Sequence, residues 1–230
     1  MKEENQNWLE RLSPGQRFQH ILVMISFIIL IVTGLVLKFH ENWFSRLVIN
    51  LEGGIIARGI FHRLAAAILM FVSLVHFLHI VFTERGHKDF LLMLPRKKDF
   101  SDAILKVGFI LGLSEKEPKF DKYAPKDKFQ YWAVVLGSLL MIVTGLVLWF
   151  QSQAMLVLPK WVFDITAVLH GYQGVLIGIV VILWHLYNVH LNPKDFPMSK
   201  VWLDGKISLE ELKKEHPLQY EREYKNKIQG

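Results

Sequence analysis

Histidine is the residue type with the most chemical potential in this chain, which has ten histidines and no cysteine. Two of them, His170 and His185, lie fifteen residues apart within one apolar stretch. At about 1.5 Å per helical residue they are separated by roughly 22 Å, most of a hydrocarbon core about 30 Å thick. A polar ring is costly at that depth, and neutral imidazole is a good ligand for haem iron. The spacing therefore predicts haem irons stacked across a membrane.

The lack of cysteine limits the redox centres that the chain can hold. Without thiolates there is no ligand for a protein-bound iron–sulfur cluster, no attachment point for a c-type haem and no disulfide. Any redox centre here is held by histidine or methionine. We therefore expect non-covalent haem b.

Apolar residues are concentrated in four runs, 18–39, 60–82, 129–150 and 162–191. Each run is long enough to cross a bilayer as a helix, and none alternates as the strands of a membrane barrel do. No small-residue cleavage site follows the first run, so we expect a retained helix there rather than a signal peptide. The predicted fold class is an all-α integral membrane four-helix bundle with a cytoplasmic middle loop and tail.

Basic residues are distributed unevenly around these runs. Of the 27 lysines and arginines, 11 fall between Arg85 and Lys128 and 8 fall from Lys194 onward. Because cytoplasmic loops carry the excess of basic residues, both termini and the middle loop are expected in the cytoplasm. Nucleic-acid binding is a poor explanation for charge placed in this way. The expected parts are a cytoplasmic N-terminal segment (1–17), a transmembrane dihaem domain (18–191) with a cytoplasmic loop (84–128), and a cytoplasmic tail (192–230).

The loop and the tail also contain short helical signals. In the middle loop the apolar pieces Phe90–Leu94 and Ile104–Leu113 predict short interfacial helices. In the tail, Ser208-Leu209-Glu210-Glu211 has the pattern of a capping box, which predicts a helix running toward Lys214.

The two halves of the chain repeat one another at an offset of 111 residues. The seven residues Ile31–Leu37 are identical to Ile142–Leu148, and Pro14–His20 aligns with Pro125–Tyr131. The second apolar run of each half opens with a histidine, His62 or His170, and carries another near its end, His76 or His185. Seven identical residues in a row indicate a duplication, so we expect two similar hairpins.

Depth in the membrane sorts the histidines into two sets. With the N-terminus inside, His62 and His170 lie near the outer face. The inner set combines His185 with His20 or His76, and spacing alone favours a symmetrical His76–His185 pair. Two axial imidazoles at each depth predict two bis-histidine haems, a ligation that suits electron transfer. His79 and His190, one turn further out, are expected to meet haem propionates, headgroups or water. Three histidines outside the spans are expected to be solvated: His40, His87 and His216.

Small and basic residues accompany the histidines. Gly171 and Gly174 would leave room for a porphyrin, although small residues also serve close helix packing in membranes. Arg63, beside His62, could pair with a haem propionate or extend to lipid headgroups.

An ordered set of short motifs resembles the cytochrome b (gamma) subunit of membrane-bound formate dehydrogenases. The wider group includes the b-type cytochromes of nickel–iron hydrogenases, and the resemblance covers nearly the whole chain. The motifs are Arg17-Phe18-Gln19-His20, Ile60-Phe61-His62, Lys122-Tyr123, Val143-Thr144-Gly145, Leu169-His170, Trp184-His185-Leu186-Tyr187, Gly205-Lys206-Ile207-Ser208, Lys214-Glu215-His216-Pro217 and Tyr220-Glu221-Arg222-Glu223.

This resemblance implies a ligand set, a cofactor and partners. One haem b would be held by His62 and His170 and the other by His20 and His185, with His76 as the alternative inner ligand. Electrons would arrive from an iron–sulfur subunit, coupled to a catalytic dehydrogenase or hydrogenase subunit. They would reduce menaquinone or ubiquinone near the inner haem. The chain would then be a multi-pass protein of the bacterial or archaeal cytoplasmic membrane, with no substrate chemistry beyond electron transfer.

The sequence departs from the resemblance at two places. The formate dehydrogenase subunits carry Asn-Ala-Gly-Gln before the third helix, where polar groups help to form the quinone pocket. Here that stretch is Ala124-Pro125-Lys126-Asp127, so the quinone site is altered, shifted, or absent in favour of a cytoplasmic electron-transfer partner. His76 and His79 have no obvious counterpart in the typical formate dehydrogenase subunit, which leaves open a swapped inner ligand or an extra haem.

Two rival functions share these features. A self-standing cytochrome b561 that oxidises quinol would have the same fold and haems without partner subunits. A transporter or structural membrane anchor would use the histidines to line a polar cavity instead.

Overall fold

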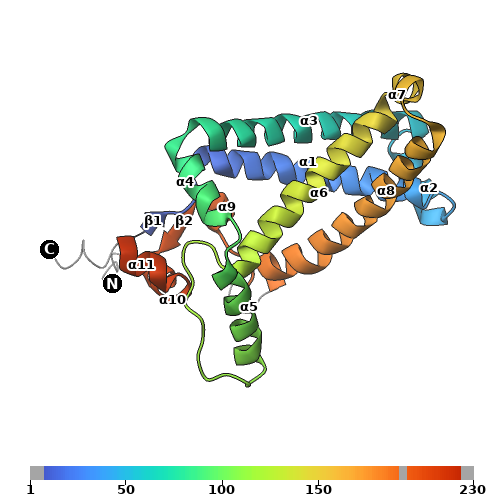
Figure 1. Ribbon diagram of the computed structural model, residues 1–230. Helices are drawn as coiled ribbons and strands as arrows, with labels where there is room; N and C mark the ends of the chain where they lie inside the picture. Colours follow the sequence, from blue (N-terminus) through green and yellow to red (C-terminus); the bar gives the residue numbers. More distant parts are fainter. Residues whose placement is uncertain (1–7, 192–195, 224–230) are drawn as a thin grey trace, which may run out of the picture. The chain divides into compact units, whose positions relative to one another are not determined.

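The computed structural model describes residues 8–191 and 196–223 of the chain. The start of the expected N-terminal segment and parts of the expected tail lie outside the described residues. Among the described residues helix dominates, and four helices are long and apolar enough to cross a membrane (Figure 1). The all-α membrane bundle is therefore confirmed, whereas the division at 1–17, 18–191 and 192–230 stays a prediction.

The four membrane-capable helices match the four predicted runs. They are α1 (Pro14–Lys38), α3 (Ile55–Phe82), α6 (Pro125–Trp149) and α8 (Lys160–Ile179), the last continued by the π-helical segments η1 (Val180–His185) and η2 (Tyr187–Leu191). Their mean hydropathies lie between 1.9 and 2.8. Both α1 and α6 begin at a proline. Proline fits the first helical position because an N–H group there has no partner within the helix, so its absence costs no hydrogen bond. The helices therefore begin slightly before the apolar runs.

Shorter helices join these spans. They are α2 (Trp43–Leu51), α4 (Glu84–Met93), α5 (Lys97–Ile110) and α7 (Gln151–Val157). Asn42 caps α2 by accepting from the Phe44 N–H, and Thr83 caps α4 by accepting from the Gly86 N–H. The helices α4 and α5 confirm that the two apolar pieces of the middle loop are helical.

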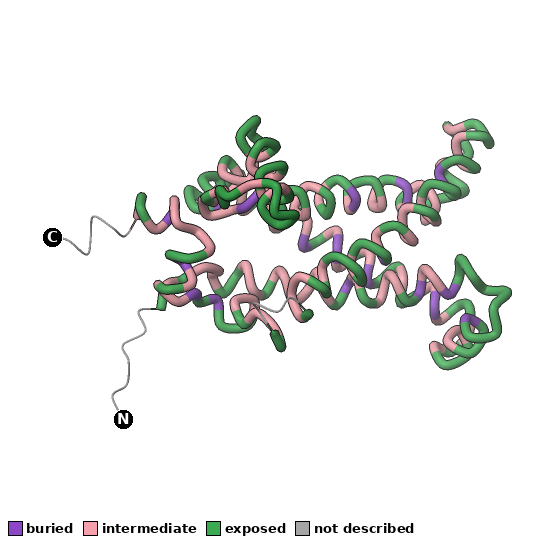
Figure 2. The backbone as a smooth tube through the Cα atoms, turned by 90° about the horizontal axis from the view of Figure 1, so that it is seen from below, coloured by how far each residue is buried: buried purple, intermediate pink, exposed green. Residues whose placement is uncertain are grey.

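Most apolar side chains of the spans are exposed at the protein surface. In the most apolar window of each helix only 11–17% of residues are buried, and Figure 2 shows buried positions as isolated points along the tube. Phe71 is 62% exposed and Leu183 is 68% exposed, whereas the small residues Ser26 and Ala65 are almost fully buried. Small residues at the helix contacts and large apolar ones facing outward are typical of helices packed in lipid.

The chain folds as two compact units. The hairpin unit comprises residues 15–76 and 135–199, and the terminal unit comprises 1–14, 77–134 and 200–230. Within the hairpin unit, α1 and α3 contact one another through Thr33 and His62, and α6 and α8 through Thr144 and His170.

The terminal unit is joined by contacts between segments far apart in the sequence. Strand β1 (Trp8–Glu10) pairs antiparallel with β2 (Lys206–Ser208), and Leu9 is opposite Ile207. The sequence did not predict this ribbon, because three residues are too few to show a strand alternation. The remaining helices are α9 (Val201–Asp204), α10 (Leu209–Glu215) and α11 (Pro217–Glu223). Ser208 caps α10 by accepting from the Glu211 N–H, which confirms the predicted helix start.

A network of polar groups fixes the tail to the middle loop inside this unit. Arg11 donates to the Gln219 side chain at 2.8 Å and to the Lys122 carbonyl. His216 donates through Nδ1 to the Asp121 carbonyl at 2.8 Å, and its Nε2 lies 3.2 Å from the Arg11 guanidinium. The expectation that His216 is solvated is therefore wrong: it is a half-buried link between distant segments.

Candidate functional site

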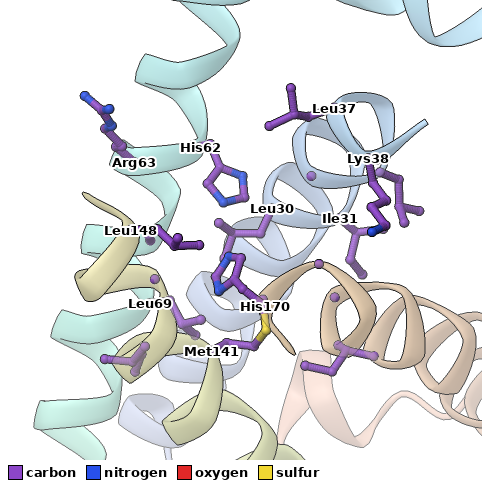
Figure 3. A pocket seen from close by; sticks show the side chains of 18 of the residues that line it. Leu30, Ile31, Leu37, Lys38, His62, Arg63, Leu69, Met141, Leu148 and His170 are labelled. Carbon is purple, nitrogen blue, oxygen red and sulfur yellow. The ribbon is translucent and has the colours of Figure 1, made fainter. Parts of the chain in front are cut away.

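The rings of His62, on α3, and His170, on α8, face one another with their centroids 6.4 Å apart. Figure 3 shows the two rings directed into one space from different helices. Two imidazoles on opposite sides of one metal have a ring-centre separation of about 6.2 Å. This is the sum of two metal–nitrogen bonds of about 2.0 Å and two nitrogen-to-centre distances of roughly 1.1 Å. The separation of these two rings, called the cavity pair below, therefore suits a shared metal ion.

A threonine one helix away holds each ring of the cavity pair. Thr33 Oγ1 lies 2.8 Å from Nδ1 of His62, and Thr144 Oγ1 lies 2.9 Å from Nδ1 of His170. The two threonines occupy equivalent positions of the repeat, which the structure therefore uses twice for the same contact. Because Nδ1 is engaged, Nε2 is the nitrogen of each ring left to bind a metal.

A glycine follows each threonine and gives the ring its space. A Cβ on Gly145 would lie 3.2 Å from Cε1 of His170, which is a tight contact, and one on Gly34 would lie 3.6 Å from Cε1 of His62. The repeated Thr-Gly sequence thus combines a hydrogen-bonding group with room for an imidazole.

The cavity pair lines a cavity of about 660 Å³ within the hairpin unit. This volume lies in the range of pockets for organic ligands. The lining is mostly apolar and includes Lys38, Arg58 and Arg63 but no aspartate or glutamate. The cavity therefore favours a largely apolar ligand that carries negative charge.

Arg58 is the most deeply buried of these cations. It is 8% exposed, lies four residues before His62 on α3, and donates through Nη1 to the Thr33 carbonyl at 2.8 Å. Its buried Nε has no hydrogen-bond partner within the described part of the chain. A buried guanidinium with an unused donor fits an anionic group in the cavity.

The other two cations stand at aromatic rings. Lys38 Nζ lies 4.0 Å from the centre of the Tyr172 ring, and the Arg63 guanidinium lies 5.7 Å from that of Trp149. In Figure 3 Arg63 extends away from the two imidazoles. Both side chains are long and exposed enough to turn toward a ligand charge at the cavity edge.

A second pair of histidines lies at another level of the hairpin unit. His20, on α1, and His185, at the end of η1, have ring centroids 6.3 Å apart. This separation matches that of the cavity pair, so the second pair has the same spacing for a shared metal. The sequence left His20 and His76 as alternative partners of His185, and the structure brings His20 to it.

The π-helical segment changes the direction in which His185 points. An α-helix turns by about 100° per residue, so fifteen α-helical residues would leave His170 and His185 about 60° apart around the axis. The i→i+5 bonds of η1 make wider turns with less rotation per residue, which reduces that offset. The single long α-helix expected for 162–191 is thus corrected: the α-helix ends at Ile179 and π-helix follows.

The other predicted site residues are divided between the two units. Gly171 and Gly174 line the cavity, where a Cβ would meet Lys38 and Met141 respectively. His79 contacts the Thr83 hydroxyl through Nδ1 at 3.1 Å in the terminal unit. His40 and His87 are exposed, as expected.

Sequence reasoning missed five residues beside the cavity pair or its threonines. They are Thr33, Thr144, Gly34, Gly145 and Arg58. The signal was present, because the repeat contains Thr-Gly in both halves and Arg58 stands one helical turn before His62. The repeat was interpreted as evidence of duplication and not as part of a site.

The donor set of each pair fits haem. Two imidazole nitrogens on opposite sides of a metal are the axial ligands of a bis-histidine haem, whose four remaining ligands belong to the porphyrin. The apolar walls of the cavity, its cations and the unused donor of Arg58 fit a porphyrin with propionates.

Known proteins support the same chemistry. A family model described as prokaryotic cytochrome b561 matches residues 11–194. The chain is 25% identical over 202 residues to the cytochrome b556(Fdn) subunit of the nitrate-inducible formate dehydrogenase of Escherichia coli K12. The aligned region covers 87% of this chain and 85% of that relative. The corresponding subunits of Escherichia coli O157:H7 and Shigella flexneri match to the same extent.

Proposed function

The chain belongs to the prokaryotic cytochrome b561 family, and from that premise we propose that it is a dihaem membrane subunit of a respiratory oxidoreductase. As a member of this family it is a membrane cytochrome b of electron transfer that binds haem b. The observation that carries the dihaem proposal is the presence of two histidine pairs with nearly equal ring separations, 6.4 Å and 6.3 Å.

The proposed axial ligands come from three helices. His62 and His170 would hold one haem, and His20 and His185 would hold the other. We propose His20 rather than His76 for the second haem because its ring stands at the metal-bridging distance from His185. His170 and His185 are fifteen residues apart on α8 and η1, which places the two pairs at different levels along this helix.

Basic side chains would neutralise the propionates of the haem at the cavity pair. Arg58 lines the cavity and has a buried Nε without a hydrogen-bond partner among the described residues. Lys38 and Arg63 line the same cavity. Gly171 and Gly174 add the space that a flat ring needs beside α8. When bound, each haem supplies a reversible one-electron couple, and the protein supplies its ligands, its counter-charges and an apolar surrounding.

We further propose that the chain connects an iron–sulfur partner subunit to menaquinone or ubiquinone in a complex that also contains a catalytic dehydrogenase or hydrogenase subunit. The support is the match to a formate dehydrogenase cytochrome subunit over most of both chains. The basic residues of 85–128 and of the tail favour a cytoplasmic position for these segments and for both termini.

The quinone contacts would differ from those implied by the formate dehydrogenase resemblance. In the first turn of α6 the polar groups serve the fold: Asp127 accepts from the Ala124 N–H at 2.9 Å, and Lys128 binds Asp99 at 2.8 Å. Nearby, Tyr123 lies against the Arg11 guanidinium, and burial raises the pKa of its hydroxyl. We propose that quinone binds with altered contacts; direct transfer to a cytoplasmic partner is the alternative.

Haem stoichiometry of alanine variants tests this function. The full chain, expressed with ample haem and purified in detergent, should contain two haems by pyridine haemochrome assay. His62→Ala, His170→Ala, His20→Ala and His185→Ala should each retain one, and His40→Ala, an exposed histidine, should retain two.

The remaining variants separate the alternatives. Loss of a haem in His76→Ala but not in His20→Ala would reassign the second pair. No haem in the parent protein would overturn the dihaem proposal and favour a transporter or anchor. Quinol oxidation by the purified chain without any partner would instead favour a self-standing cytochrome b561.

A further inference from the structure

Both rings of the cavity pair are held by a threonine hydroxyl whose own proton is used elsewhere. Thr33 Oγ1 donates to the Ile29 carbonyl at 2.6 Å, and Thr144 Oγ1 donates to the Leu140 carbonyl at 2.7 Å. A hydroxyl has one proton to give and two lone pairs with which to accept. Each threonine can therefore meet its histidine only as an acceptor.

This requirement fixes the proton on the imidazole. Nδ1 of His62, 2.8 Å from Thr33 Oγ1, must carry a hydrogen, and so must Nδ1 of His170, 2.9 Å from Thr144 Oγ1. The lone pair of each ring is then on Nε2. Both rings are thus held in the tautomer that a metal ligand requires before any metal binds.

We propose that Thr33 and Thr144 are positioning residues that lower the reduction potential of the haem at the cavity pair; this inference rests on the proposed ligation by His62 and His170. A hydrogen bond from Nδ1–H to an acceptor raises the basicity of the imidazole and its donation through Nε2. Stronger donation stabilises ferric over ferrous iron. Because both axial ligands are held in this way, the two contacts act on the same iron.

The backbone around Thr33 strengthens this arrangement. Arg58 donates to the Thr33 carbonyl at 2.8 Å, while the hydroxyl of the same residue receives the His62 proton. Thr33 is 2% exposed and Thr144 is 5% exposed, so water does not compete for either hydroxyl. A buried N–H that lost such an acceptor would have no substitute.

Thr166 provides a matched control in the same unit. It is a buried threonine, 8% exposed, and donates to the Val162 carbonyl at 2.8 Å in the same i−4 manner. It lies four residues before His170 on α8 and does not line the cavity. Replacing it by valine removes a buried hydroxyl without removing an acceptor of the cavity pair.

The test is a redox titration of the full chain in nanodiscs, followed by its haem absorption bands. Thr33→Val and Thr144→Val should each retain two haems and raise one of the two midpoint potentials, leaving the other unchanged. The double variant should raise the same potential further. Thr33→Ser and Thr144→Ser, which keep the hydroxyl, should restore the parent value, and Thr166→Val should not shift either potential.

Several outcomes would overturn the inference without touching the proposed ligation. One such outcome is that Thr33→Val or Thr144→Val retains two haems with unchanged midpoint potentials. Another is that Thr166→Val shifts a midpoint potential as much as these two variants do. If a valine variant loses its haem, retention in the serine variant supports the hydroxyl contact, whereas equal loss in serine contradicts it. A parent protein without haem would instead contradict the proposed function.

Discussion

The two hairpins, α1 with α3 and α6 with α8, hold their histidines alike but differ one helical turn earlier. In both, a threonine accepts from Nδ1 and a glycine gives the ring its space. Four residues before the histidine, the first hairpin has Arg58 and the second has Thr166, each 8% exposed. Arg58 reaches the Thr33 carbonyl, and Thr166 bonds only within its own helix among the contacts described.

This difference separates two tasks. The shared contacts orient an imidazole, and they occur at both rings of the cavity pair. The arginine adds positive charge to the lining of the cavity, and the second hairpin has an uncharged residue at the matching position. A duplicated scaffold can therefore repeat the ligand geometry and still place charge on one side only.

The largest expected difference between the hairpins follows from replacing these two residues. Arg58→Leu should weaken haem binding at the cavity pair by roughly ten- to a hundredfold, because hydrogen bonds to a charged group contribute about 1.5–3 kcal/mol. Thr166→Val should change it by less than about twofold, since its hydroxyl is satisfied within α8. Haem loss to an excess of apomyoglobin, followed by absorption, measures both. Equal effects would remove the proposed role of Arg58.

A smaller effect is expected from adding one methyl group beside each ring. In Gly145→Ala the new Cβ would stand 3.2 Å from His170, and overpacking of this kind costs about 1–3 kcal/mol. In Gly34→Ala it would stand 3.6 Å from His62, an ordinary contact, and the helix gains about 0.5–1 kcal/mol from losing a glycine.

Thermal unfolding of the haem-loaded protein, followed by Soret absorption, measures this pair. Gly145→Ala should lower the midpoint and Gly34→Ala should leave it equal or higher. A lower midpoint for Gly34→Ala than for Gly145→Ala would contradict the closer approach of Gly145 to its ring that the structure describes.

The smallest expected effect is a pH dependence of the terminal unit, and the hairpins are best compared at a pH where this unit is intact. In the terminal unit, burial and the neighbouring Arg11 lower the pKa of His216 below its usual value near 6.5. The folded unit therefore favours neutral His216. The stability that the unit gains from neutral His216 is fully present above about pH 6.5, and it is lost as the pH falls through the lowered pKa of the folded state. Protonation would also remove the Nε2 acceptor of Arg11.

Hydrogen exchange of residues 206–223, corrected for intrinsic rates, should show the tail opening more often at pH 5 than at pH 7.5. His216→Gln does not titrate and should lose most of this dependence. An unchanged tail in the parent protein at pH 5 would show that His216 does not link the tail to the middle loop as described.

The fold was largely predictable because its strongest signals are local. Twenty-residue apolar runs specify membrane helices without reference to the rest of the chain, and Ser208 specifies a helix start by its own side chain. The ribbon of β1 and β2 joins residues about 200 positions apart, and three-residue strands have too little pattern to predict. His216 was misjudged for the same reason, since its partners are Arg11 and Asp121.

The sequence predicted which residue type forms the candidate site, but it did not predict which residues contact one another there. Spacing identified the histidines, but it favoured a symmetrical His76–His185 pair because His76 follows His62, and His185 follows His170, at nearly the same interval. The π-helical segment alters the direction of His185, and the structure places His20 beside it. Thr33 and Thr144 were visible in the repeat, yet their contacts with the imidazoles exist only once the helices pack.

Electron paramagnetic resonance of the oxidised, purified chain tests the central claim most directly. Two bis-histidine haems predict two distinct low-spin ferric signals of equal amount and no high-spin ferric signal. His62→Ala should remove one low-spin signal and leave the other unchanged, and His20→Ala should do the reverse. A single low-spin signal, or a high-spin signal in the parent protein, would contradict a haem held by each histidine pair.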